Sequence, residues 1–199
     1  MSKSAKAIWI MVALGAVALL LVAVTVALGP GRDPVVWLVR GAALLGYLSL
    51  FIAILASAYM RELYRILGRP FLWAHHVLSV SGLILLFLHP VGAAIDAASV
   101  AVFVPRFDSW RLFFTLGGRL AVYLIWIASA GALLRRTWRK SWRIIHMLNY
   151  IAFLLGTVHA TLIGTDLSRP FLRLIPIAMA LVVIWVFVRK RMGKRRVKA

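Results

Sequence analysis

The sequence predicts an all-α polytopic membrane protein, a bundle of six transmembrane helices with both termini in the cytoplasm. The first observation is composition: 63% of the 199 residues are hydrophobic, whereas a soluble domain averages about 45–50%. The second is that the apolar residues form six runs of roughly 20 residues, the length that crosses a bilayer core about 30 Å thick. The third is that most Lys and Arg lie between these runs. Little chain remains for a soluble catalytic domain, so we expect one domain over residues 1–199.

The expected spans are residues 8–28, 36–59, 71–95, 112–134, 144–163 and 171–188. The apolar run of the first is longer than the roughly 7–15 residues of a signal-peptide core, so a retained anchor is favoured over a cleaved signal. The longest loop, residues 96–110, precedes the fourth span. Pro176 falls in the first turns of the sixth span, where it kinks the helix or is accommodated.

Charge patterning predicts the orientation of these spans. Of the 24 Lys and Arg residues, 17 lie in the N-terminus, in the connections around residues 61–69 and 135–143, and in the tail. The positive-inside rule then places both termini in the cytoplasm, which in a bacterium implies the inner membrane. The net charge of +19 indicates topology and attraction to anionic lipid rather than nucleic-acid binding, because no helix-turn-helix or aromatic-lined basic groove is apparent.

Four histidines form two pairs, His75 with His89 in the third span and His146 with His159 in the fifth. Their spacings are 14 and 13 residues, or roughly 20 Å along a helix. Both spans run from inside to outside, so His75 and His146 share the cytoplasmic half, while His89 and His159 share the outer half. Two cross-helix imidazole pairs without an open coordination position are typical of six-coordinate electron-transfer haems. We therefore expect two stacked bis-histidine haems.

The helical phase leaves two alternatives open. At about 100° per residue, fourteen residues return to within about 40° of one face, whereas thirteen miss it by about 140°. This phase favours His75 over His76 as the inner ligand, and His76 would then face the headgroups or a haem propionate. Span five needs local unwinding, a bulge, a tilt or haems at different azimuths, and Gly156 would admit a macrocycle close to the backbone. A haem-free scaffold or transporter with structural histidines is the alternative function.

Cationic side chains near the histidines are possible partners for haem propionates. Arg69 and Arg143 are placed for the inner haem, and Arg119 for the outer haem unless it extends to the headgroups. No carboxylate falls in the middle of a span, which argues against a proton pump. The chain has no Cys, which excludes Cys-ligated iron–sulfur clusters, and no Gly-rich nucleotide fingerprint follows a strand.

The paired histidines, together with the segment WRIIHMLNY at residues 142–150 and VHA at residues 158–160, resemble the ferric reductase-like transmembrane domain superfamily. That superfamily includes ferric reductases, NADPH oxidases and the haem subunit of the bacterial periplasmic methionine sulfoxide reductase. The resemblance implies two non-covalent b-type haems, whose axial ligands are His75, His89, His146 and His159. It also implies electron flow from a cytoplasmic flavin to an acceptor at the outer face.

The chain ends at Ala199 without a flavin and NAD(P)H domain, so it is similar to a stand-alone haem subunit that works with partners. We expect the donor to be a cytoplasmic flavin reductase or quinol. The acceptor would be a periplasmic reductase, ferric iron or oxygen.

Overall fold

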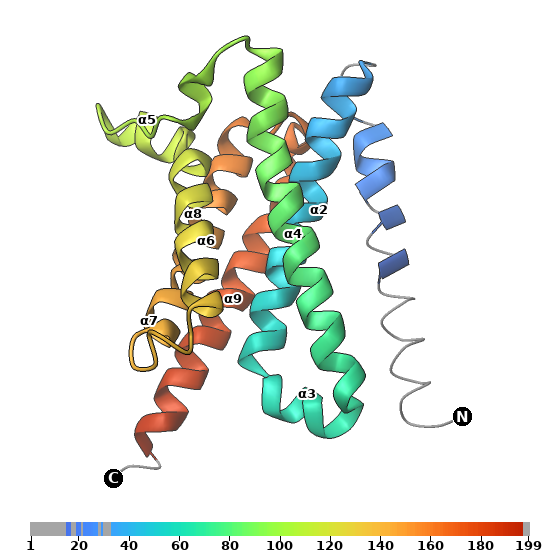
Figure 1. The fold of residues 1–199 in the computed structure, drawn as a ribbon. Coiled ribbons are helices and arrows are strands. Elements are labelled where there is room, and N and C mark those ends of the chain that lie inside the picture. Colours follow the sequence, from blue (N-terminus) through green and yellow to red (C-terminus); the bar gives the residue numbers. More distant parts are fainter. Residues whose placement is uncertain (1–14, 17–18, 21, 28, 30–32, 197–199) are drawn as a thin grey trace.

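The structure is a computed structural model that describes residues 15–16, 19–20, 22–27, 29 and 33–196. All regular structure in these residues is helical, which confirms the all-α class (Figure 1). The first predicted span, residues 8–28, lies largely outside the described residues. The prediction of six spans therefore stays a prediction.

Within the described residues, four helical segments are long and apolar enough to cross a membrane. They belong to α2 (Pro34–Ala58), α4 (Arg69–Asp96), the pair α7 (Trp142–His146) and α8 (Leu148–Ile163), and α9 (Pro170–Arg196). A shorter apolar helix is α6 (Gly117–Leu133). The 25 residues of α2 span about 37 Å at 1.5 Å per residue, which exceeds the hydrocarbon core of a bilayer. The described chain thus has the character of a membrane protein.

The long helices pack in two pairs, α2 with α4 and α6 with α8, and α9 packs against α2 and α8. Glycines allow α2 and α4 to approach closely. A Cβ added at Gly82 would lie 2.8 Å from Ser49 Cβ, and one at Gly46 would lie 2.8 Å from Leu86 Cγ. Small residues at such positions are typical of helix pairs in membranes, because they bring the backbones together.

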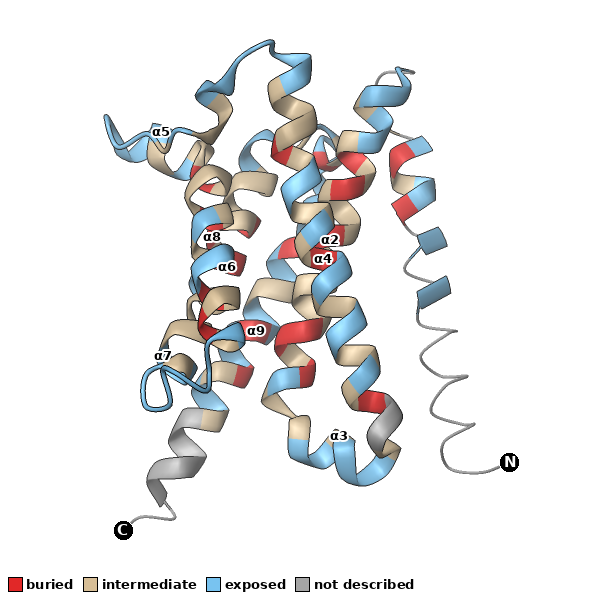
Figure 2. Ribbon diagram, viewed as in Figure 1, coloured by how far each residue is buried: buried red, intermediate tan, exposed pale blue. Residues whose placement is uncertain are grey.

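The core is small and lies between the helices. One cluster, between α6 and α8, consists of Ala121, Ile125, Ala152 and Leu155. A second, where α2, α8 and α9 meet, consists of Ile54, Phe153 and Val183. The outward sides of the helices are apolar as well, with large exposed side chains such as Trp73, Ile84 and Leu181 (Figure 2). An apolar outer surface of this extent fits contact with lipid.

The helix boundaries differ from the sequence prediction at four places. The connection after α2 is itself helical, as α3 (Met60–Leu67). The fourth expected span divides at Leu116 into α5 (Trp110–Thr115) and α6. The fifth divides at Met147 into α7 and α8.

The fourth difference is at the end of the chain, where α9 runs to Arg196 and keeps Pro176 inside it. The basic tail continues the helix because Lys and Arg are good helix formers. Figure 1 shows α3, α7 and the C-terminal end of α9 at one end of the bundle, and α5 at the opposite end. Two short 3-10 helices complete the described elements, η1 (Val100–Phe103) after α4 and η2 (Thr165–Leu167) after α8.

Candidate functional site

A gap separates α4, which carries His75 and His89, from α8, which carries His159 and directly follows His146 of α7. Each packs along a different neighbour, α4 along α2 and α8 along α6, and the two have little direct contact. A cavity of about 70 Å³ opens between the helices, and His75 and His146 both line it. Ligand sites in proteins commonly have about 300–1,000 Å³. The cavity is therefore smaller than such sites, and it lies directly beside these two imidazoles.

The inner pair brings His75 of α4 near His146 at the end of α7. The two rings are close enough to interact electrostatically. The Nδ1 atom of His75 is buried and has no hydrogen-bond partner among the described residues. A buried polar atom without a partner costs free energy and calls for an explanation, and a bound ligand is one such explanation.

The ring of His146 is oriented by a backbone carbonyl. Its Nδ1–H donates to the carbonyl oxygen of Ala128 on α6, at 3.2 Å. The Asn149 amide nitrogen lies 3.4 Å from the same Nδ1, so with Nδ1 protonated the amide would turn its oxygen toward the ring. The cavity lining also includes Ser79 and Tyr150, which add polar groups to a largely apolar wall.

Both histidines of the outer pair also donate Nδ1–H to a backbone carbonyl of another helix, as His146 does. The Nδ1–H of His89 donates to the Val39 carbonyl at 3.2 Å, and that of His159 donates to the Thr115 carbonyl at 2.7 Å. A carbonyl oxygen only accepts, so the ring proton of a neutral imidazole lies on Nδ1 and the lone pair of Nε2 is free. Metal-bound histidines almost always donate their other ring N–H in this way. His89 and His159 are also close enough to interact electrostatically.

The break between α5 and α6 makes the Thr115 carbonyl available. In a continuous helix the amide of Arg119 would bond to Thr115, four residues earlier. Here the Arg119 amide donates to the Leu116 carbonyl instead, at 2.9 Å. Gly118, just inside α6, makes room for the ring, because a Cβ there would lie 2.7, 2.9 and 3.0 Å from three ring atoms of His159.

Span five is distorted between its two histidines, directly after His146. The amide of Met147 is shared between the carbonyls of Arg143 at 3.2 Å and Ile144 at 3.1 Å, and that of Tyr150 bonds to Met147 at 3.0 Å. The bonds to Ile144 and Met147 have the three-residue spacing of a tighter turn. Such a turn rotates the chain by about 120° per residue instead of about 100°. Each tightened residue therefore reduces the angular mismatch that the thirteen-residue spacing creates.

Open space lies beside α8 between the two histidines. A Cβ added at Gly156 would have no neighbouring atom within 4 Å. This glycine is three residues before His159 and so lies about one helical turn below it. The space fits the expectation that a bulky group can approach the backbone here.

The other predicted site residues lie elsewhere. His76 is exposed, and its Nδ1–H donates to the Leu72 carbonyl in its own helix at 2.6 Å. The rings of His76 and the adjacent His75 meet edge to face, with their centroids 5.9 Å apart. Within the described chain, His75 lines the cavity and His76 does not.

Two of the predicted propionate partners, Arg119 and Arg143, do not line the cavity. Arg143 is exposed, with its guanidinium carbon 5.1 Å from the ring of Trp142. The Nη1 group of Arg119 donates to the carbonyls of Ala101 and Val104 at 2.6 and 2.9 Å, so this side chain holds the outer loop. The side chain of Arg69 lies outside what the structure describes.

Several features of the site escaped the sequence prediction. The carbonyls of Val39, Thr115 and Ala128 could not be recognised in the sequence. Every residue has a backbone carbonyl, so the residue type does not indicate which one accepts a hydrogen bond. The Gly117-Gly118 pair was a readable signal, since adjacent glycines at a helix start mark a close approach. No group of three or more His, Asp or Glu side chains that could hold a metal ion occurs in the described part of the chain.

Comparison with known proteins identifies a family whose description assigns no function. No curated protein and no solved structure matches the chain. One family model, described as a domain of unknown function, matches residues 35–166. The matched range begins inside α2, includes both histidine pairs and ends at Asp166. Because it covers well over half of the 199 residues, the chain belongs to the DUF8596 family.

Proposed function

We propose that this protein is a di-haem b membrane protein that carries electrons across the membrane, from a cytoplasmic donor to an acceptor at the outer face. The observation that carries the proposal is the arrangement of its histidines. His75 lies near His146 and His89 lies near His159, each pair joining two helices that leave a gap between them. These are the pairs that two bis-histidine sites at different depths require.

The residues present fit such a group. Each of His89, His146 and His159 donates its Nδ1–H to a carbonyl, which keeps Nε2 available as a ligand atom and fixes the orientation of the ring. A b-type haem bound by two imidazoles supplies reversible one-electron chemistry. The chain itself supplies ligation, spacing and an apolar surrounding that excludes water.

The proposal includes six spans with both termini in the cytoplasm of a bacterium. It is supported by the gathering of α3, α7 and the end of α9 at one end of the bundle (Figure 1), because these segments carry or adjoin most of the basic residues. His75 and His146 belong to the half of the bundle nearer that end. This end would therefore receive the electrons.

The resemblance to the ferric reductase-like transmembrane domain supplies the partners. In our proposal the electron donor is either a flavin reductase that brings its own flavin or a quinol. The acceptor would be a periplasmic reductase, ferric iron or oxygen. The redox chemistry would thus be shared between this chain and its partners.

A dithionite-reduced minus oxidised spectrum of the protein, purified after haem-replete expression, tests the proposal. We expect sharp b-type bands from two haems per chain. A flat spectrum would reject the proposal and favour a membrane scaffold or transporter in which the histidines only stabilise the bundle.

A further inference from the structure

We propose that the buried ion pair between Arg40 and Asp166 positions the outer histidine pair and balances the charge around the outer haem. This inference rests on the proposed function, because it concerns the environment of one of the two haems. It assigns a role to two residues that lie outside α4, α7 and α8, the helices that carry the four histidines.

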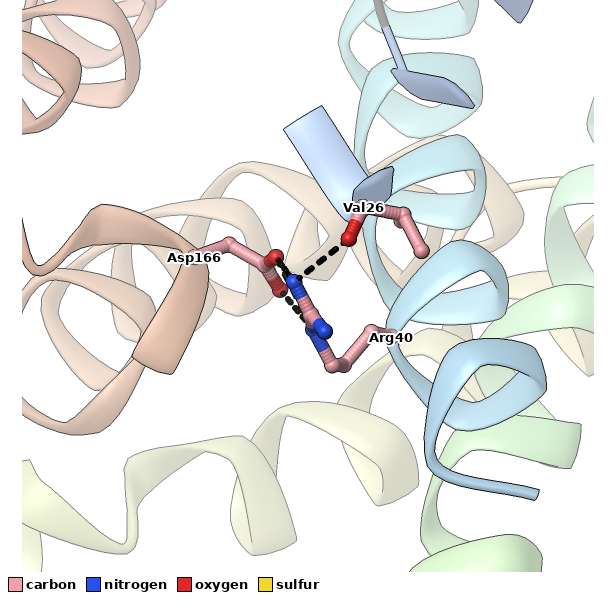
Figure 3. A network of polar contacts seen from close by, with 3 residues as sticks. All are labelled: Val26, Arg40 and Asp166. Atoms are coloured by element: carbon pink, nitrogen blue, oxygen red, sulfur yellow. Dashed lines mark hydrogen bonds and ion pairs between the residues drawn. The ribbon is translucent and has the colours of Figure 1, made fainter. Parts of the chain in front are cut away.

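The ion pair is built with several hydrogen bonds. The Nε–H of Arg40 donates to both carboxylate oxygens of Asp166, at 2.9 and 3.0 Å, and its Nη2 group also donates to Oδ1. The same Nη2 donates to the Val26 carbonyl at 3.1 Å (Figure 3). The two side chains are only 7% and 9% exposed. The guanidinium therefore ties three separate segments of the chain together.

The position of the pair connects it to both outer histidines. Arg40 directly follows Val39, whose carbonyl accepts the Nδ1–H of His89 at 3.2 Å. Asp166 lies in η2, seven residues after His159 and three residues beyond the end of α8 at Ile163. The pair thus links the part of α2 that orients His89 to the end of α8 that carries His159. A change at either member would alter the relative placement of the two rings.

Stability alone is a weak reason for a buried ion pair. Removing two charges from water costs about as much as their attraction returns, and apolar replacements of such pairs are often neutral or stabilising. An intact pair has little net charge, so it creates only a small field at a nearby redox centre. One member alone would leave a full charge in a low-dielectric region, where electrostatic effects are strong. The intact ion pair therefore keeps an unbalanced charge away from the outer haem.

The midpoint potentials of both haems test the proposal, because a purely structural role of the ion pair would not predict potential shifts of opposite sign in the two single variants. Arg40→Gln leaves the carboxylate of Asp166, which favours the more positive oxidised haem and lowers the outer potential. Asp166→Asn leaves the guanidinium and raises the outer potential. We expect shifts of opposite sign, and the Arg40→Gln/Asp166→Asn double variant should lie between them. The inner haem should shift less in every variant.

The exposed ion pair between Arg106 and Asp108 offers a matched control. Its side chains are 49% and 54% exposed and lie in the loop between α4 and α5. Asp108→Asn removes the same charge as Asp166→Asn, and solvent should screen the change. We expect no shift of either potential in this variant.

Spectroelectrochemical titration of detergent-purified wild type and variants separates the outcomes. Two haems in the wild type support the proposed function, whereas no haem rejects it. If the wild type binds two haems, opposite shifts or selective loss of the outer haem support the role of the ion pair. Shifts of the same sign, no shift, or equal loss of both haems would overturn it. The haem that disappears in His159→Ala identifies the outer one.

Discussion

The imidazole Nδ1 of His159 and the backbone carbonyl of Thr115 lie 2.7 Å apart, although the residues are 44 positions apart in the chain. The contact exists because the helix breaks at Leu116 and leaves that carbonyl without its usual amide. It is the shortest of the three bonds from His89, His146 and His159 to a carbonyl of another helix. A helix irregularity thus orients a ring that the sequence places only by spacing.

Gly118→Ala should disturb the outer haem. The added Cβ would lie 2.7 Å from the nearest ring atom of His159, and overpacking of this kind costs about 1–3 kcal/mol. We expect the variant to lose outer haem selectively, measured as the haem-to-protein ratio. Gly41→Ala is the matched control, because a Cβ there meets nothing within 4 Å and alanine favours the helix. Equal haem content in the two variants would contradict this geometry.

His75→Ala and His76→Ala should differ although the residues are adjacent. His75 lines the cavity with His146, whereas His76 is exposed and bonded to its own helix. We expect His75→Ala to remove the inner haem and His76→Ala to keep both haems. The absorbance of the reduced bands, normalised to protein, checks this. Loss of haem in His76→Ala alone would reverse the ligand assignment.

Composition and charge were enough to predict the all-helical class, because long apolar runs leave few alternatives to a membrane helix. The helix breaks were harder to predict. Met147 is a good helix former, so nothing in the local sequence marks it as a break point. At Leu116 the following Gly117-Gly118 pair was a signal that the prediction of one continuous span did not use. The helical connection α3 was also missed, because its eight residues were interpreted as a basic loop. The first span, residues 8–28, is untested for the most part.

The histidine pairs were predicted from spacing and direction, and the structure brings the same residues together across the helices. The orienting carbonyls could not be predicted, because they depend on how α2 and α6 pack against α4 and α8. The ion pair of Arg40 with Asp166 was missed for a similar reason. Each residue fell near the end of a span, where a solvated charge is the usual interpretation, and only the tertiary fold shows them buried.

Arg119→Gln should loosen the outer loop. The Arg119 guanidinium donates to the carbonyls of Ala101 and Val104, while the Tyr123 hydroxyl donates to Phe103 at 2.8 Å. Hydrogen bonds from a charged donor contribute about 1.5–3 kcal/mol. We expect hydrogen exchange in residues 97–109 to become faster, with little change elsewhere. Tyr123→Phe should have a smaller effect in the same direction, and an unchanged loop in Arg119→Gln would refute the assignment.

Acid should release α3 from α9. The Lys190 Nζ donates to Glu62 Oε1 at 2.8 Å and lies 4.1 Å from the ring centroid of Tyr59. The hydrogen bond from Lys190 holds the pKa of the Glu62 carboxyl below its ordinary value. A depressed pKa contributes stability above the unfolded pKa, and this contribution is lost as the pH falls through the folded pKa.

The α3 segment should therefore be more protected at neutral pH than below the ordinary Glu pKa of about 4.3. Hydrogen exchange corrected for its intrinsic pH dependence measures the difference. The Glu62→Gln variant is the control, since it should lack this pH-dependent protection. The same change of protection in wild type and control would exclude Glu62 as the cause.

The haem-to-protein ratio of single histidine variants tests the central claim most directly. The wild type should bind two b-type haems, His146→Ala and His159→Ala should each lose one, and the lost haem should differ in midpoint potential between the two. The double variant should bind none. Two haems retained in both single variants, or both lost together in each, would contradict the pairing of His75 with His146 and of His89 with His159.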